Sequence, residues 1–183
     1  MIAGAGPSVR IRPGAIEVTE ERVFGPAVAT LARRFARRIL GFDEVRSLAL
    51  DPARAMAVVS YRLAKGDPGI FLTRLADAVA KGTAAGVGAT ELPDWPDGEP
   101  VTLYRHAGVV SIFEQLHIAD GKLAALHPAL ESNKTLAAQI ENAMLIVPGV
   151  LQANVQKELR LRFDPRAVAA LQLVRIAEAA IVA

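Results

Sequence analysis

The residues best suited to acid–base or metal chemistry are three histidines that lie close together in the chain, His106, His117 and His127. His117 and His127 are separated by a predicted hairpin, so they could approach each other across neighbouring strands. A zinc site requires three or four ligands at close spacing, and no paired carboxylate completes a set here. We therefore expect structural histidines, with no bound metal and no other cofactor.

Other reactive groups are scarce. The chain has no cysteine, which excludes disulfides, thiolate metal sites and thiol catalysis. The paired acids, Glu20 with Glu21 and Asp43 with Glu44, fall at the boundaries of expected helices and strands, where acids are common. The early glycines lack the preceding strand that a dinucleotide-binding motif requires. The protein is therefore predicted not to be an enzyme.

Four arginines form the first candidate binding surface. They are Arg33, Arg34, Arg37 and Arg38. On a predicted helix, this spacing of i, i+1, i+4 and i+5 places them on one side. That side is opposite the apolar stripe of the helix, which contains Val28, Leu31 and Phe35. Such a face could contact a protein, an anionic membrane, RNA or only solvent. RNA-binding sheets also need exposed aromatic residues, which are few here, so no nucleic-acid partner is predicted.

The last predicted helix, from Pro165 to Ala183, forms the second candidate surface because it is apolar on two sides. One stripe, which contains Leu171, Val174 and Ile181, would cover the helix's own sheet. The other stripe would need the sister unit, a second copy of the chain or a foreign partner to cover it; it consists of Leu173, Ile176 and Ala180. We expect this second stripe to take part in docking.

Composition limits the classes of protein. Of 183 residues, 52% are hydrophobic and 22% are charged, which indicates a folded chain with a sizeable core. A net charge of +2 is too small to indicate a nucleic-acid partner. The N-terminus has neither a basic start nor a long apolar run, so no secretory signal is expected. No stretch approaches the roughly 20 apolar residues that cross a bilayer.

The order of predicted elements indicates two tandem units. A helix, a glycine stop, a hairpin and another helix occur twice, which predicts an α+β protein of two ferredoxin-like (βαββαβ) units, the second lacking its last strand. The expected parts are an irregular arm at 1–14, a first unit at 15–92, a Pro-rich linker at 93–108 and a second unit at 109–183. The expected elements include a helix from Pro26 that ends at Gly41, a hairpin at 45–63, a strand at 101–104 and a helix at 134–147. Residues 86–92 are expected to supply the last strand of the first unit.

The residues at these boundaries resemble a known family. The helices run into Gly41-Phe42 and Pro148-Gly149-Val150, and the hairpins end in Tyr61 and in Phe163-Asp164. This pattern is similar to the heavy-metal-associated (HMA) domain of copper chaperones and metal-pumping P-type ATPases. That family binds metal through two cysteines in the loop between its first strand and first helix. The corresponding stretches here, 22–27 and 129–133, hold no thiolate, and soft metals such as Cu(I) need sulfur ligands.

These observations predict a non-catalytic structural or adaptor subunit that docks on a larger protein assembly, such as a membrane-embedded transporter or an energy-transducing complex. The alternative, implied by the resemblance alone, is a metal-transport accessory or regulatory module beside a P-type ATPase. The expected location is the cytoplasm, with a peripheral position on the cytoplasmic face of the inner membrane as its variant. Whether the arginines touch lipid or protein stays open at this point.

Overall fold

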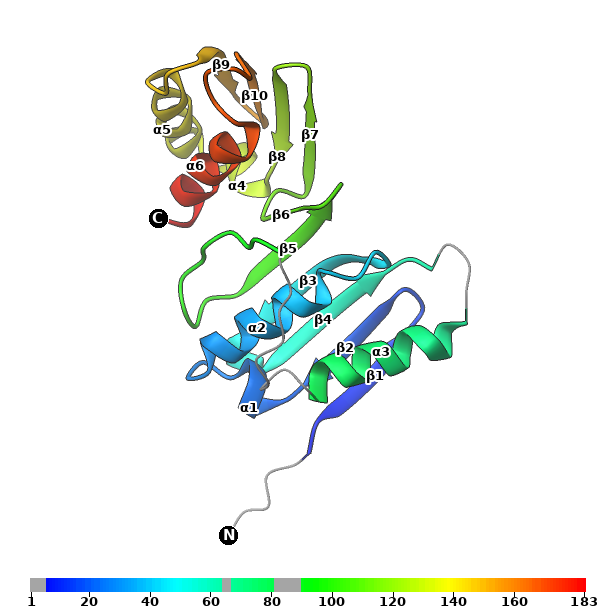
Figure 1. Ribbon diagram of the computed structural model, residues 1–183. Helices are drawn as coiled ribbons and strands as arrows, with labels where there is room; N and C mark the ends of the chain where they lie inside the picture. Colours follow the sequence, from blue (N-terminus) through cyan, green and yellow to red (C-terminus); the bar gives the residue numbers. More distant parts are fainter. Residues whose placement is uncertain (1–5, 64–66, 81–89) are drawn as a thin grey trace. The chain divides into compact units, whose positions relative to one another are not determined.

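The structure is a computed structural model that describes residues 6–63, 67–80 and 90–183. It confirms the α+β class, with two antiparallel sheets and six α-helices in the described residues (Figure 1). The chain divides into two compact units. Unit 1 comprises residues 1–92 and 96–110, and unit 2 comprises residues 93–95 and 111–183. Over the described ranges, no helix has the length and hydropathy needed to cross a membrane.

Unit 1 is built on a six-stranded sheet in the order β1-β2-β4-β3-β5-β6. Residues of β2 and β4 alternate between buried and partly exposed, as in half-buried strands, whereas all five residues of β1 are exposed. The strands are β1 (Ser8–Arg12), β2 (Ala15–Thr19), β3 (Val45–Asp51), β4 (Met56–Tyr61), β5 (Val101–His106) and β6 (Val109–Ser111).

Helices cover one face of this sheet (Figure 1). They are α1 (Glu21–Phe24), α2 (Ala29–Ile39) and α3 (Pro68–Ala80), and a 3₁₀ turn, Pro52–Arg54, joins β3 to β4. Phe35 and Ile39 of α2 are fully buried, and Phe71 and Leu75 of α3 are nearly so. The Phe24 ring of α1 meets Phe35 edge-on with centroids 4.8 Å apart, which anchors the short helix in the core.

Several boundaries in unit 1 differ from the sequence predictions. Strand β1 lies inside the stretch 1–14 that was expected to be irregular, because its backbone pairs with β2 along its full length. Strand β5 lies inside the expected linker 93–108 and pairs with β3. The helix predicted from Pro26 begins at Ala29, after the separate helix α1. Most of the strand predicted at 86–92 lies outside the described residues.

Unit 2 holds a four-stranded sheet in the order β7-β8-β10-β9. Its elements are β7 (Gln115–Ala119), β8 (Lys122–Leu126), α4 (Pro128–Ser132), α5 (Lys134–Leu145), β9 (Val150–Val155), β10 (Glu158–Phe163) and α6 (Ala170–Val182). The inward side chains of β8 and β10 join those of α5 and α6 in one apolar core, which includes Leu123, Leu159, Ile140, Met144 and Leu173. The opposite face of the sheet is polar.

The two units repeat one topology. Each has a hairpin, a short helix, a longer helix, a second hairpin and a further helix, and the four strands β1-β2-β4-β3 have the same order as β7-β8-β10-β9. A backbone hydrogen bond recurs as well. The Tyr61 N–H donates to the Gly14 carbonyl at 2.9 Å, and the Phe163 N–H donates to the Gly121 carbonyl at 2.8 Å. Both glycines have positive φ, +74° and +72°, in the turn of the first hairpin.

The edge of the unit 2 sheet beside β8 is occupied. Strand β7 pairs with β8 along its whole length. The N-terminal hairpin therefore supplies the strand beside β8. The edge strands of this sheet are β7 and β9, and each carries an exposed apolar side chain, Ile118 at 37% and Leu151 at 67%.

Candidate functional site

The arginines of α2 lie where the sequence predicts, on the side away from the core. The buried residues of this helix are Ala32, Phe35, Ala36 and Ile39. Arg34 and Arg37 are exposed, and Arg38 is partly exposed. Arg33 has a structural role instead, since its guanidinium lies 2.5 Å from the Asp97 carboxylate. The remaining three, which we call the arginine face, place three positive charges within five residues of helix.

The apolar stripe predicted for docking on α6 is instead part of the core of unit 2. Leu173 is fully buried, and Ile176 and Ala180 pack against the same core cluster. Both stripes of this helix are thus covered by unit 2 itself, at least in part. Leu173 is not available to a partner, and the prediction that this stripe docks is wrong for that residue.

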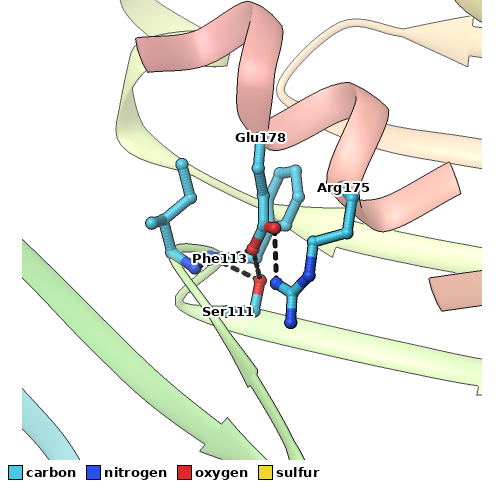
Figure 2. Close-up of polar contacts among 5 residues, drawn as sticks. Ser111, Phe113, Arg175 and Glu178 are labelled. Carbon is cyan, nitrogen blue, oxygen red and sulfur yellow. Dashed lines mark hydrogen bonds and ion pairs between the residues drawn. The ribbon is translucent and has the colours of Figure 1, made fainter. Parts of the chain in front are cut away.

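α6 can be buried so deeply because its one acidic side chain is fully satisfied (Figure 2). Glu178 is 1% exposed. Its carboxylate accepts from the Ser111 hydroxyl at 2.6 Å and from the Ile112 N–H at 3.0 Å, and it lies 2.6 Å from the Arg175 guanidinium. Ser111 in turn accepts from the Phe113 N–H at 3.1 Å. We call these residues the Glu178 cluster.

The chemistry of the Glu178 cluster is structural. A buried carboxylate is stable when hydrogen bonds and a cation compensate for its lost hydration. Here two donors from 111–112 and one cation from α6 provide that compensation, so the cluster ties the helix to the segment before β7. No imidazole is part of it that could activate the Ser111 hydroxyl as a nucleophile. In the sequence, the only indication that Glu178 is buried is its position on a nearly apolar helix.

The three histidines do not combine into one site. His106 belongs to unit 1, whereas His117 and His127 belong to unit 2. His117 is exposed on the polar face of the sheet, and His127 is partly buried before α4. In the parts of the chain that the structure describes, no group of three or more His, Asp or Glu side chains is arranged to hold a metal ion.

His127 has a role that the sequence does not reveal, as the N-cap of α4. Its Nδ1 accepts a hydrogen bond from the Ala129 N–H at 3.1 Å, so the neutral ring must carry its proton on Nε2. Burial lowers the pKa of His127 below its ordinary value of 6.5, and the nearby Glu114 carboxylate opposes that shift. Both the cap and the burial favour the neutral imidazole.

The segments that resemble the metal-binding loop are filled with apolar side chains. In unit 1 this segment is occupied by α1, and Phe24 there is 1% exposed. In unit 2 it is occupied by α4, and Leu130 there is also 1% exposed. Asn133 caps α5 through its side-chain oxygen, which accepts from the Leu136 N–H at 3.0 Å. Each segment therefore serves to begin a helix and to fill a core.

Three of the four paired acids have side-chain partners within unit 1. The Glu20 carboxylate caps α1 by accepting from the Arg22 N–H at 3.2 Å. Asp43 lies 2.6 Å from Arg105, and Glu44 lies 2.9 Å from Arg74. These contacts agree with the expectation that acids at element boundaries are structural.

Two surfaces of unit 2 were missed by sequence reasoning. One is apolar, around the turn from α5 to β9, where Leu145, Ile146 and Leu151 are 51%, 82% and 67% exposed. The other is the polar side of the sheet, which we call the open face. It contains a hollow of about 630 Å³ lined by side chains of all four strands, among them Lys122, Gln152, Asn154, Arg160 and Arg162. In the sequence, Arg160 and Arg162 alternate with leucines that are buried in the structure, and this alternation could have indicated a polar sheet face.

Comparison with known proteins adds no relative. No family model, no curated protein and no solved structure matches this chain at a significant level.

Proposed function

We propose that this protein is a non-catalytic adaptor subunit that docks on a larger protein assembly through the arginine face of α2. The carrying observation is that Arg34, Arg37 and Arg38 project from a helix whose opposite side is fixed in the core. Side chains on a rigid element keep their positions, so they can match a pattern of carboxylates on a partner. The partner surface that fits is acidic.

The topology of the units supports the same reading. We propose that each unit is a variant of the ferredoxin-like fold in which a hairpin strand before the first strand replaces the last one. β1 and β7 fill that position in the two sheets. Membership of an HMA-like group without metal-binding cysteines is part of this proposal, and it is supported by the repeated helix–turn–hairpin order. The buried Phe24 and Leu130 in the loop positions favour docking over metal transfer.

A peripheral position on the cytoplasmic face of the inner membrane is compatible with this function, since a basic helix also attracts anionic headgroups. The choice between protein and lipid is made by geometry. An acidic protein surface can pair each arginine with a fixed carboxylate in bidentate geometry, whereas lipid headgroups rearrange freely. We therefore commit to a protein partner and treat vesicle binding as a contrary outcome.

The experiment uses the full chain in its native cells. A photo-reactive amino acid replaces Arg34 in one variant and Arg10 in another, because both positions are exposed cations of unit 1. The arginine face should cross-link to a discrete protein, whereas the position on β1 should not. Purified partner should then bind wild-type protein at an ionic strength of about 0.1 M and release it near 1 M.

A pair of variants with equal charge change tests whether the effect is local. Arg34→Gln with Arg37→Gln should weaken binding, whereas Arg10→Gln with Arg12→Gln should not, because those two lie on β1 and face Glu17 at 3.8 Å. Equal loss in both pairs would mean that only net charge matters. Binding to anionic vesicles with no protein cross-link would replace the adaptor proposal with a lipid-binding one.

A further inference from the structure

The open face of unit 2 has the size and lining of a ligand site. Its hollow of about 630 Å³ lies within the range of about 300–1,000 Å³ that holds small molecules. α5 and α6 pack on the other face of the sheet, and all strands contribute to the hollow. Its side chains are mostly cations, amides and one imidazole, which suits a charged polar ligand better than an apolar one.

The strand register concentrates positive charge at one place in this hollow. Arg162 of β10 and Lys122 of β8 are direct cross-strand neighbours. Like charges placed directly opposite each other destabilise a sheet. Neither side chain has an ion-pair partner among the described residues, whereas the neighbouring Arg160 is paired with Glu158. Two uncompensated positive charges therefore face the hollow side by side.

The corresponding positions in unit 1 carry no charge. The Gly14–Tyr61 and Gly121–Phe163 hydrogen bonds align the two units, so that Lys122 and Arg162 correspond to Ala15 and Ser60. Ala15 and Ser60 are likewise direct cross-strand neighbours. The repeated topology therefore does not require two cations here, and their presence in unit 2 indicates that the charge pair serves a ligand.

We propose that the open face of unit 2 binds a small phosphomonoester, with its phosphate held between Lys122 and Arg162. A phosphomonoester carries about −1.5 to −2 charges at pH 7, which matches the two cations. Arginine binds phosphate oxygens through two parallel N–H donors, and lysine adds a point charge. The amides of Gln152 and Asn154 stand beside Arg162 and Arg160 in the register, where they can bond to hydroxyl groups of the ligand.

This site is independent of the arginine face, so each can fail without the other. The small hollow favours a single phosphorylated metabolite or nucleotide over a polymer, because it lies within one sheet face and its two free cations fit one phosphate. A sugar phosphate and a nucleoside monophosphate share this chemistry. They are separated by the titration below.

The test is calorimetric titration of the full chain with inorganic phosphate, ribose 5-phosphate, AMP and adenosine. The first three should bind, adenosine should not, and the ester that binds most tightly identifies the source. Lys122→Gln with Arg162→Gln should weaken binding by about tenfold to a hundredfold, the worth of one or two charge-assisted hydrogen bonds. Arg10→Gln with Arg12→Gln should leave the affinity unchanged.

Stability provides a second readout that does not depend on choosing the right ester. Because the two cations repel each other, the ligand-free Lys122→Gln variant should melt at the same temperature as wild type or at a higher one. Added phosphate should raise the melting temperature of wild type more than that of the variant. A lower melting temperature of the ligand-free variant would overturn the proposal. So would equal affinity of the paired variant, absence of binding by all phosphates, or affinity for single-stranded RNA that grows with its length.

Discussion

The Glu178 cluster gives the sharpest prediction, because its atoms can be removed one group at a time. In Glu178→Gln the Oε1 atom can still accept from Ser111 and Ile112, and only the contact with Arg175 is lost. In Glu178→Leu all three contacts are lost, and two buried donors have no acceptor. The leucine variant should therefore be the less stable of the two.

The magnitudes follow from these contacts. Loss of one charge-assisted interaction costs about 1.5–3 kcal/mol, which is the expectation for Glu178→Gln. Two unsatisfied buried donors cost about 1–3 kcal/mol each, so Glu178→Leu should lose about 3–5 kcal/mol after the added apolar burial is counted. Glu131→Gln is the matched control, since its ion pair with Lys157 joins side chains that are 65% and 80% exposed. Its effect should stay within about 1 kcal/mol.

The assay can be confined to unit 2. Trp95 is the single tryptophan of the chain, is 7% exposed and belongs to unit 2, so its fluorescence reports unfolding of that unit. Urea unfolding followed at this residue gives the free energy of unfolding for each variant. The structural role of the Glu178 cluster would be refuted if the free energy of unfolding of Glu178→Leu were within about 1 kcal/mol of the wild-type value. It would also be refuted if Glu178→Leu were no less stable than Glu178→Gln.

Three further predictions concern single positions. Since the pKa of His127 is lowered in the folded state, unit 2 should be fully stable above pH 6.5 and should lose stability as the pH falls below that value. Urea titrations at several pH values should show a weaker pH dependence of stability in His127→Asn. Gly121→Ala should destabilise the protein more than Gly14→Ala in thermal melts. Both glycines have positive φ, but a Cβ on Gly121 would also lie 2.6 Å from a backbone carbonyl oxygen. Leu173→Asp should abolish the Trp fluorescence transition of folded unit 2, whereas Ile146→Asp, at a site 82% exposed, should leave it nearly unchanged.

Elements with strong local signals were predicted well from the sequence. The helix expected at 134–147 is α5, and the hairpin expected at 45–63 is β3 and β4, because apolar periodicity and turn residues agree there. Strand β5 was partly recognised, but its place in the sheet was not. Pairing between β5 and β3 joins residues about fifty positions apart, and no local pattern encodes that partner.

The candidate site was predicted less well, for a related reason. The arginine face follows from helix period alone, so it was found. The fate of the α6 stripe depends on Glu178, which is buried only because Ser111 and Ile112 reach it from a segment more than sixty residues earlier. The open face was missed because the side-by-side placement of Lys122 and Arg162 exists only once the register of β8 and β10 is known.

The position of β7 also affects how unit 2 assembles. A strand that followed α6 could reach the edge of the sheet only after the whole unit had been traversed. β7 instead reaches β8 through a two-residue turn, so this edge forms through local contacts. Closing a short loop costs little chain entropy, and local contacts speed folding. We expect the β7–β8 hairpin to begin forming during synthesis and to serve as the template on which β10 later pairs, with α6 closing the core last.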